Sequence, residues 1–529
     1  MTGMEQVFKE KGDTWPKILK YNYERYGDHH RAMRSKHYGI WQPHTWKDYY
    51  LSVKHLALGL LSLGFEPGDK VLIIGDNAPQ WYYTELAAQA NHGVSVGMFS
   101  DLTPREVKYI AENSEARFAI VDDQEQVDKF LEIKHELPFL KRIIYWNYKG
   151  LAHYDDPLLM GYREVLERGR KYEEEHPGLF EQNVDSGKAD DVCALVYTSG
   201  TTGVSPKGAV HTYRTMRTGA DCLLNLDPWN ENDNIVPQLP PAWMTEQWFG
   251  IGCHLLSASI LNFAEERETQ ERDIKEIRPD VVCYGARQWE SQAAMVHARI
   301  QGADPLKKFA FRLLMPVGDK MTDLKFRKQK PGFFLRILYA LANLALFRPL
   351  RDSLGLSNAR ICYTTGAMLS PDALRFYHAL NLPLKNLYGT TEGGALTGAK
   401  NDDIRLETVG PAHKGTEVKI TDEGELVYRQ PGIFVGYYKD RDKTAEMLKD
   451  GWFHTGDCGF VREDGHIVFV DRVKDLIALE SGDKLSPQSI EARLRFSPYI
   501  KDAWVVAGKE RTYASVIIII NYNTVGRWA

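Results

Sequence analysis

Hydrophobic and polar residues are arranged in the first 365 residues in a way that predicts helices and strands in turn. Apolar residues recur at helical spacing in three segments: 46–63, 81–91 and 104–113. Short apolar runs predict strands at 70–75, 93–98, 117–121, 192–197, 260–263, 281–284 and 359–364. Strands that alternate with helices are typical of a mostly parallel sheet covered on both faces. We therefore predict a large α/β region.

The pattern changes from about residue 408. Short apolar runs separated by Gly, Asp and Pro predict strands at 419–421, 425–428 and 466–470. We therefore predict a large N-terminal domain of mixed, mostly parallel sheets over 1–473, which ends in a small β subdomain over about 408–473. A small α+β domain is predicted over 474–529. Because the chain ends at Ala529, soon after an apolar run, we expect this C-terminal domain to be incomplete.

Composition and charge exclude several classes of protein. The 529 residues are 43% hydrophobic and 26% charged, as in an ordinary soluble protein, and the formal net charge of −5 gives no attraction to nucleic acid. The six cysteines are far apart and form no Cys-x-x-Cys pair, which argues against a zinc site or a disulfide framework. Scattered reduced thiols and a polar N-terminus without an apolar export segment predict a cytoplasmic protein. The sequence gives no indication of the oligomeric state.

A glycine- and threonine-rich stretch directly follows the strand predicted at 192–197. Glycines let the main chain approach a polyanion closely, hydroxyl and N–H groups bind its oxygens, and a trailing lysine adds positive charge. The order Pro-Lys-Gly at 206–208 differs from the Gly-Lys-Ser/Thr ending of a Walker loop. We therefore predict a phosphate-binding loop that is not a Walker loop. Its candidate residues are Thr198, Ser199, Gly200, Thr201, Thr202, Gly203 and Lys207.

Four further segments follow this loop in a characteristic order: Thr-Thr-Gly-Ala-Met-Leu-Ser-Pro at 364–371, Tyr-Gly-Thr-Thr-Glu at 388–392, Gly-Trp-Phe-His-Thr-Gly-Asp at 451–457 and Asp-Arg-Val-Lys-Asp-Leu-Ile at 471–477. With these segments, nearly the whole chain resembles the adenylate-forming superfamily of acyl-CoA synthetases, luciferases and nonribosomal peptide adenylation domains. The resemblance implies an ATP site. The residues that it assigns to the nucleotide beyond the phosphate loop are Gly366, Ala367, Tyr388, Gly389, Thr390, Thr391, Asp457 and Arg472.

The resemblance also implies a role for each group. Gly366 and Ala367 line the adenine pocket, Tyr388 packs against adenine, and Thr391 contacts the α-phosphate. Glu392 binds Mg²⁺ with help from Thr201, which suits a hard cation that prefers oxygen ligands. The implied catalytic residues are Thr201, Lys207, Thr391 and Glu392.

The last two segments are implied to hold the sugar and to join the domains. Asp457 binds both ribose hydroxyls, since a carboxylate can accept two charge-assisted hydrogen bonds from a vicinal diol. Arg472 contacts the ribose or a phosphate. Lys474 and Asp475 form the hinge between the large and small domains, and Gly482 lines the path of the CoA thiol.

Within the superfamily, the segment 236–348 resembles the long-chain acyl-CoA synthetases. Those enzymes have a Leu-Pro-x-x-His-x-x-Glu segment at the acyl site. Here Trp243 stands in the place of the histidine, and the related Pro-Arg-x-Trp-Glu segment has Ala286 in place of the proline. The acid class therefore stays open between fatty acids and aromatic or polycyclic acids. Candidate residues of the acyl pocket are Trp243, Trp248, Tyr284 and Gly366, although large aromatic residues also serve as plain core.

Residues 305–352 form an insertion typical of that branch. We predict an apolar helix at 333–347 with basic residues on both sides. Such a helix can lie in a membrane interface, which would give peripheral membrane contact. The alternative is a core helix beside a solvated basic loop.

Taken together, the resemblance implies an AMP-forming acyl-CoA ligase that uses ATP, CoA and Mg²⁺ to activate a carboxylic acid, most simply a medium or long fatty acid. An acyl-AMP ligase and a non-catalytic protein that binds a nucleotide or an acyl group are the alternatives. The superfamily uses a further lysine near the end of its C-terminal domain, which the resemblance places beyond Ala529. We expect a chain without this lysine to adenylate about 10²–10³ times more slowly.

Overall fold

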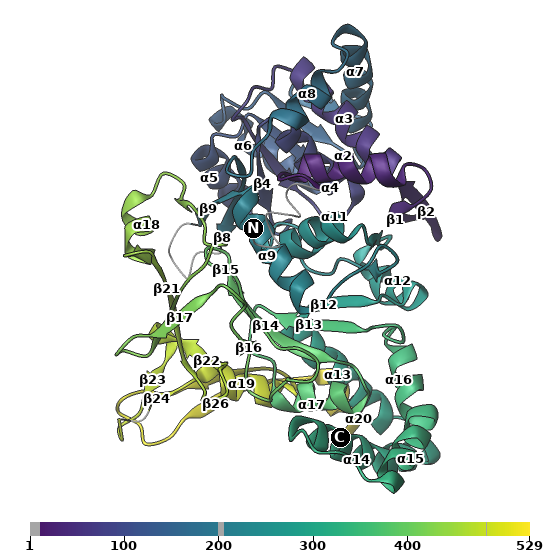
Figure 1. Cartoon of the computed structure of the whole chain (residues 1–529), viewed down its shortest axis with the longest axis vertical. Helices are drawn as coiled ribbons and strands as arrows, with labels where there is room; N and C mark the ends of the chain where they lie inside the picture. The colour runs from purple at the N-terminus through teal and green to yellow at the C-terminus, as the bar shows by residue number, and fades with distance from the viewer. Residues whose placement is uncertain (1–10, 199–205, 483, 529) are drawn as a thin grey trace. The chain divides into compact units, whose positions relative to one another are not determined.

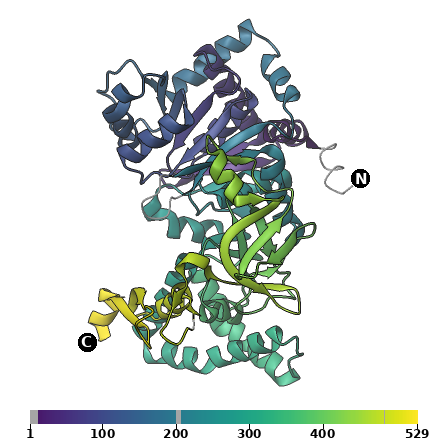
Figure 2. The same ribbon diagram turned by 90° about the vertical axis from the view of Figure 1, so that its left-hand side faces the viewer.

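The computed structural model describes residues 11–198, 206–482 and 484–528 (Figures 1 and 2). These residues form two compact units, each described here by itself. The first unit extends to residue 267 and includes the later segment 431–445, and the second contains the remainder together with residues 225–227. The predicted boundary at 473 lies within the second unit.

The main sheet of the first unit has the strand order β19-β9-β8-β4-β3-β5-β6-β7. From β8 to β7 the strands are parallel, while β9 is antiparallel to both β8 and β19. The bounds are β3 Lys70–Ile74, β4 Val94–Met98, β5 Phe118–Val121, β6 Arg142–Tyr145, β7 Leu159–Gly161, β8 Val192–Thr198, β9 Lys207–Thr212 and β19 Gly436–Tyr437. The strands predicted at 70–75, 93–98, 117–121 and 192–197 are confirmed as β3, β4, β5 and β8.

Helices cover both faces of this sheet. Alternate strand residues such as Leu72 and Ile74 pack against α5 (Pro104–Ser114) and α6 (Gln124–Ile133). Local sequence fixes where helices begin: Thr103 and Glu106 form a reciprocal capping box at the start of α5. The other helices are α2 Trp15–Tyr26, α3 Trp46–Ser62, α4 Pro79–Ala90, α7 Tyr162–Glu175, α8 Leu179–Ser186, α9 Tyr213–Leu226, α10 Met244–Glu246, α11 His254–Ser257 and α18 Arg441–Met447.

A second set of strands in the first unit consists of β1 (Arg31–His37), β2 (Ile40–Thr45), β10 (Asn234–Ile235) and β11 (Ile260–Phe263). β11 is parallel to both β10 and β1, and β2 is antiparallel to β1. The strand predicted at 260–263 is confirmed as β11. The hairpin of β1 and β2 was not predicted.

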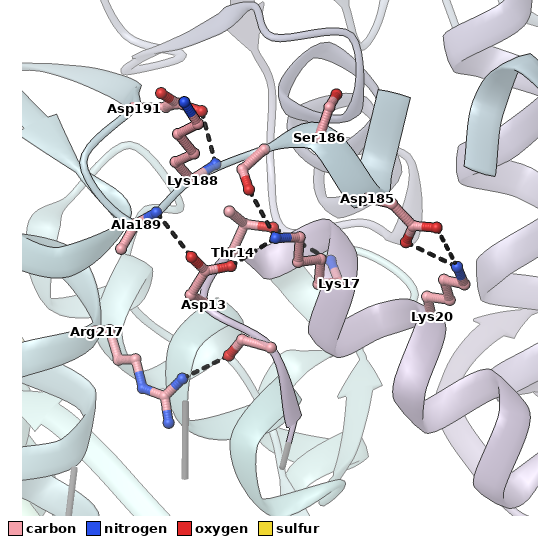
Figure 3. A network of polar contacts seen from close by, with 12 residues as sticks. Asp13, Thr14, Lys17, Lys20, Asp185, Ser186, Lys188, Ala189, Asp191 and Arg217 are labelled. Atoms are coloured by element: carbon pink, nitrogen blue, oxygen red, sulfur yellow. Dashed lines mark hydrogen bonds and ion pairs between the residues drawn. The ribbon is translucent and has the colours of Figure 1, made fainter. Parts of the chain in front are cut away.

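A polar network fastens the start of α2 to the segment that leads into β8 (Figure 3). Lys17 Nζ lies 2.8 Å from Asp13 Oδ1 and donates to the carbonyl of Gly187 at 2.7 Å. The other carboxylate oxygen of Asp13 accepts from the backbone N–H of Ala189. Because β8 ends at the predicted phosphate loop, these contacts help to fix the strand on which that loop is built.

The second unit begins with strands in the order β15-β14-β13-β12. β12 (Val281–Gly285), β13 (Ile361–Thr365) and β14 (Leu384–Thr390) are parallel, and β15 (Gly394–Gly398) is antiparallel to β14. The strands predicted at 281–284 and 359–364 are confirmed as β12 and β13. The helices are α12 Gln270–Ile277, α13 Ala286–Gln301, α14 Pro305–Phe326, α15 Phe333–Ala342, α16 Arg348–Ser353 and α17 Pro371–Ala379, with the π-helical turn η4 Asn343–Phe347 between α15 and α16.

The sheet that follows has the order β16-β22-β21-β18-β17, with β20 beside β21. Its bounds are β16 Gly410–Pro411, β17 Glu417–Ile420, β18 Glu425–Arg429, β20 Leu448–Lys449, β21 Trp452–Val461 and β22 His466–Arg472. The end of the chain, yellow in Figure 2, consists of η5 Val473–Asp475, β23 Ile477–Ala478, β24 Lys484–Leu485, α19 Pro487–Arg495, β25 Ile500–Val506, β26 Ser515–Ile520 and α20 Tyr522–Trp528. The strands predicted at 419–421, 425–428 and 466–470 are confirmed as β17, β18 and β22.

Candidate functional site

The two ends of the predicted phosphate loop are paired in the first unit. Thr198, the last residue of β8, stands opposite Lys207, the first residue of β9, in the antiparallel register. Lys207 Nζ lies 3.4 Å from Asp440 Oδ2 and 5.5 Å from the centre of the Tyr437 ring. The lysine is therefore held at the mouth of the loop. The loop residues Ser199, Gly200, Thr201, Thr202 and Gly203 lie outside the described residues.

Asp440 was not among the predicted site residues. It reaches Lys207 because β19, in the later segment 431–445, pairs with β9. The backbone N–H of Lys443 and the Lys207 ammonium lower the pKa of Asp440. The charge of Lys207 is therefore already partly balanced by this carboxylate. No local pattern near 440 indicates this long-range pairing.

In the second unit, the predicted adenine-binding residues follow β13. Parallel strands bring their carboxyl ends to one edge of a sheet, where α/β proteins commonly bind ligands. Gly366 has a φ of +83°, which favours glycine, and the exposed Ala367 follows it. The register of β13 and β14 pairs Thr364 with Asn386, so Gly366 and Tyr388 are both two residues beyond that pair at the same edge.

Thr391 and Glu392 occupy the turn between β14 and β15. The residues before the turn, Gly389 and Thr390, pair with β15, and Thr390 Oγ1 accepts from the backbone N–H of Gly393. A Cβ at Gly393 would lie 1.7 Å from the Tyr428 hydroxyl, so the turn requires glycine there. The hairpin thus holds a threonine and a glutamate at its tip. Both side chains are partly exposed.

Asp457 links three strands in the second unit. The Tyr388 hydroxyl on β14 donates a hydrogen bond to Asp457 Oδ2 on β21. Arg472, opposite Asp457 in the β21–β22 register, brings its Nε to 3.0 Å from Asp457 Oδ1. Asp457 is only 2% exposed. The structure therefore brings together three of the predicted nucleotide-binding side chains around one buried carboxyl group.

Burial controls the electrostatics of this group. Burial raises the pKa of Asp457 to about 6, against the opposing effects of the Arg472 charge and the Tyr388 hydrogen bond. The negative charge of Glu392 also raises the pKa of Asp457, so these two carboxyl groups interact electrostatically. Burial likewise raises the pKa of Tyr388 far above its ordinary value, so the phenol stays protonated and acts as a donor.

Two neighbours of Asp457 were missed by sequence reasoning. The Thr455 hydroxyl accepts from the backbone N–H of Asp457, and the Thr455 carbonyl accepts from Arg472 at 3.0 Å. The ring of Phe469 lies 5.6 Å from that of Tyr388. Both neighbours lie within predicted motifs or strands. Their role depends on the antiparallel register of β21 and β22, which the sequence does not specify.

Glu290 forms a hydrogen bond with the backbone of the loop that follows Gly366. This carboxylate is 1% exposed, accepts from the backbone N–H of Ser370 at 3.2 Å, and lies 3.4 Å from Arg495 Nε in α19. A cavity of about 280 Å³ adjoins the same loop and α19. Its lining includes Met368, Leu369, Ser370, Phe469, Val470 and Ser489. Glu290 belongs to the Arg-Gln-Trp-Glu segment at 287–290, but its contact with the C-terminal segment was not predicted.

The acyl-pocket candidates are divided between the units. In the first unit, Trp243 is partly exposed and directly precedes α10, whereas Trp248 is buried with its indole against Gly219. In the second unit, Tyr284 is buried in the apolar core, 4.7 Å from the Trp289 ring. Their assignment to an acyl pocket stays a prediction.

The predicted hinge and CoA-path residues are at the surface. Lys474 and Asp475 are exposed within η5, and Gly482 is exposed with a φ of +87°. Nothing in the described geometry tests their predicted roles. Within the described part of the chain, no group of three or more His, Cys, Asp or Glu is placed to hold a metal ion.

Comparison with known families shows to which family the chain belongs. The model of the AMP-binding enzyme family matches residues 19–438, well over half of the sequence. The chain belongs to the AMP-binding enzyme family. The model of the AMP-binding enzyme C-terminal domain matches residues 474–526. The resemblance seen in the sequence motifs is thereby confirmed.

Similar curated proteins include enzymes named for fatty-acid activation. The long-chain-fatty-acid–CoA ligase ACSBG2 of Xenopus laevis is 28% identical over 522 residues, which span 96% of this chain and 69% of the relative. The protein of the same name from Gallus gallus is 29% identical, with 97% and 68% covered. Long chain acyl-CoA synthetase 1 of Arabidopsis thaliana is 27% identical, with 100% and 82% covered.

Solved structures share the fold. The anthranilate CoA ligase AuaEII, in complex with anthranoyl-AMP, has a TM-score of 0.75 at 18% identity, with 96% of this chain and 87% of that chain covered. The A domain of carboxylic acid reductase from Segniliparus rugosus, in complex with AMP and a co-purified carboxylic acid, has a TM-score of 0.72 at 18% identity, with 99% and 84% covered. The predicted fold class, a large α/β domain followed by a small α+β domain, is confirmed.

Proposed function

We propose that this protein is an AMP-forming acyl-CoA ligase that activates a fatty acid of medium or long chain. The observation that carries the proposal is the buried Asp457, held between Tyr388 and Arg472 and within the field of Glu392, in a chain of the AMP-binding family. A fixed carboxylate of this kind suits a ribose diol. The names of the similar curated proteins favour a long-chain acid.

The reaction needs an activated acyl group, because oxide is a poor leaving group from a carboxylate. The acid attacks the α-phosphate of ATP, pyrophosphate leaves, and an acyl-adenylate forms. The CoA thiol then attacks the mixed anhydride, and AMP leaves. Such chemistry asks a protein mainly to position the groups and to neutralise charge. No covalent intermediate with the protein is needed.

Each group at the site has a task in this proposal. Asp457 and Arg472 hold the ribose, and the ring of Tyr388 packs on adenine. Thr391 contacts the α-phosphate from the tip of the β14–β15 turn, and Lys207 neutralises the outer phosphates. Glu392 offers the hard oxygen ligands that Mg²⁺ prefers, and bound Mg²⁺ would neutralise phosphate charge.

We also propose a cytoplasmic location with peripheral contact to a membrane. The six cysteines are free thiols in the structure, as expected in a reducing compartment. A long-chain acid partitions into lipid, so a ligase that works beside a membrane meets its substrate at high local concentration.

Two assays test the proposed reaction. Pyrophosphate release is measured with ATP, Mg²⁺ and short, medium, long, aromatic and steroid-like acids, and CoA-dependent thioester formation is measured from supplied acyl-AMP. We expect the largest activity with long-chain acids. Glu392→Gln should reduce pyrophosphate release by about 10²–10³-fold. The control is Glu423→Gln, an exposed glutamate in the turn between β17 and β18.

The outcomes separate the competing functions. Pyrophosphate release without CoA-dependent AMP release would identify an acyl-AMP ligase instead. Nucleotide binding with neither pyrophosphate release nor thioester formation, even in a chain extended to include the superfamily's C-terminal lysine, would identify a non-catalytic binding protein. A preference for an aromatic or steroid-like acid would replace the fatty acid in the proposal.

A further inference from the structure

The helices α14 and α15 and the turn η4 carry nine large apolar side chains that are exposed. These helices pack side by side in the second unit (Figure 1). Phe334 is 84% exposed and Leu306 is 75% exposed. Single exposed apolar residues are common on soluble proteins, but a contiguous apolar patch marks an interaction surface. The outer face, as defined here, consists of Leu306, Phe309, Leu313, Phe333, Phe334, Ile337, Leu338, Leu341 and Leu344.

The inner faces of the same helices already account for their folding. Met315 of α14, and Ala342 and Phe347 of the α15–η4 segment, are buried in the core of the second unit. A Cβ at Gly318 would lie 2.9 Å from the Phe347 ring, which shows how closely the two segments pack. The outer face therefore adds nothing to this core. The alternative of a core helix at 333–347 holds only for its inner side, because most of its side chains are exposed.

Most of the basic stretch before α15 is helical and forms α14. Arg327, Lys328 and Lys330 lie in the short loop between α14 and α15, where Lys328 and Lys330 are exposed. Leu306, Phe309 and Leu313 lie three or four residues apart and share one side of this helix, while the buried Met315 and Gly318 lie on another. An amphipathic helix normally directs its apolar side to the core. In α14 an apolar strip faces solvent as well.

Positive charge surrounds the outer face. Residues 305–352 contain eleven lysines and arginines against three aspartates, a net charge of +8, whereas the whole chain carries −5. The aspartates are engaged, since Asp323 pairs with Arg375 at 2.6 Å and Asp352 with Arg278 at 3.2 Å. Among the described residues, a carboxylate lies within ion-pair distance of only two of these eleven basic side chains, Lys307 and Lys328. The other nine are Lys308, Arg312, Lys320, Lys325, Arg327, Lys330, Arg336, Arg348 and Arg351.

We propose that the outer face docks in the plane of an anionic lipid bilayer. Apolar side chains flanked by lysine and arginine match the acyl boundary and the negative headgroups of such a surface. A second copy of the chain is a poorer match, because it would bring +8 against +8 at the same face. The inference rests on the proposed function only for the source of the acid, and the docking itself needs no catalysis.

The geometry favours lying on the membrane over crossing it. The continuous helical segment Phe333–Ser353 is long and apolar enough to span a bilayer by length and composition, with a mean hydropathy of 1.4. Its inner side is nevertheless held in the core through Ala342, Leu346 and Phe347, and it carries Arg336, Arg348 and Arg351. Only its outer side is open to lipid.

Co-sedimentation with vesicles tests the proposal in the absence of ATP, acid and CoA. The full chain is mixed with vesicles of phosphatidylcholine alone, or of phosphatidylcholine and phosphatidylglycerol in equal parts. We expect the protein to pellet with the anionic vesicles and to be released as salt increases. Phe334→Glu/Leu341→Glu should weaken the binding at least about tenfold, because both side chains would leave the lipid.

The matched control changes two exposed apolar residues of the first unit. Tyr38 is 99% exposed and Ile40 is 63% exposed, so Tyr38→Glu/Ile40→Glu makes the same chemical change away from the proposed face. This variant should bind like wild type. A third variant, Lys308→Glu/Arg312→Glu, should lose the preference for anionic vesicles while its thermal melting midpoint stays near that of wild type.

Several results would overturn the proposal. One is equal pelleting of the wild type and the Phe334→Glu/Leu341→Glu variant, and another is no binding of the wild type to either vesicle. Sedimentation velocity that shows a wild-type dimer and a monomeric variant would assign the face to a second copy. Resistance of bound protein to alkaline carbonate would indicate a spanning helix. Because no step uses catalysis, a negative result here leaves the pyrophosphate assay unaffected.

Discussion

At Asp457, burial and charge act in opposite directions on one carboxyl group. Burial raises its pKa from 3.8 to about 6, and Arg472 and Tyr388 limit the increase. A folded-state pKa above the unfolded value favours the protonated form on folding, so this group lowers stability as pH rises from about 4 to 6. A ribose diol, however, needs the ionised form as acceptor. Ribose binding at this site should therefore titrate near pH 6.

Adenosine is the probe for this prediction, because it has no phosphate to titrate in the same range. We expect its dissociation constant, measured by calorimetry, to rise about tenfold between pH 7.5 and pH 5, since one pH unit below the pKa leaves about a tenth of the carboxyl ionised. Asp457→Asn should bind weakly at both pH values. The exposed Asp422→Asn is the control. A wild-type affinity that is independent of pH would show that Asp457 does not accept from the ribose.

The sequence predicted the central residues of the site but not their supports. Tyr388, Asp457 and Arg472 were predicted because they lie in motifs, and the structure groups them. Asp440 was missed because its contact depends on the pairing of β19 with β9, which are far apart in sequence. Thr455 was missed because its contact depends on the register of the consecutive strands β21 and β22. Local periodicity carries no information on such pairings.

At the scale of elements, prediction succeeded where the periodicity was simple. The buried strands β3, β4, β8 and β12 were predicted as continuous apolar runs. α14 was not recognised as a helix because basic residues are interspersed among its apolar residues and because its sequence contains Pro316, a residue that usually ends a helix. The α3–α7 contact was also not foreseen. This contact depends on Gly59 and Gly169. Glycines contribute nothing to the apolar periodicity from which helix packing is predicted.

The crossing of α3 and α7 requires glycine at position 169. A Cβ there would lie 1.7 Å from the carbonyl oxygen of His55 and 2.9 Å from the backbone nitrogen of Gly59. Glycine to alanine in an open helix usually stabilises by about 1 kcal/mol. Here we expect Gly169→Ala to destabilise the first unit by about 1–3 kcal/mol, because the helices must move apart. Thermal unfolding monitored by circular dichroism measures the shift of the midpoint.

The control for this prediction is Glu174→Ala, an exposed position in the same helix. It tests the effect of alanine on α7 without the helix contact, and its midpoint should stay near that of wild type. A rise in the midpoint for Gly169→Ala, as in an open helix, would contradict the close crossing.

At the scale of the whole chain, Glu290 links parts that are distant in sequence. It holds Ser370, in the loop after β13, and Arg495, in the C-terminal segment that follows the predicted hinge. Burial raises the pKa of Glu290, and the Arg495 charge opposes this increase. The exposed stretch from Arg472, the last residue of β22, to Lys474 in η5 contains two sites for trypsin. Its cleavage therefore reports how firmly that segment is docked.

We expect Arg495→Ala to accelerate tryptic cleavage after Arg472 or Lys474, because it leaves the buried Glu290 carboxylate without its cation. Breaking a buried ion pair in this way typically costs about 3–5 kcal/mol. Arg493→Ala is the matched control. Arg493 lies on the same helix and pairs with Glu407 at 2.6 Å, but both side chains are 57% exposed, and such surface pairs contribute about 0–1 kcal/mol. Its cleavage rate should stay near that of wild type. Equal acceleration in both variants would mean that docking depends on the net charge of α19, and equal rates in Arg495→Ala and wild type would mean that the Glu290 contact does not hold the segment.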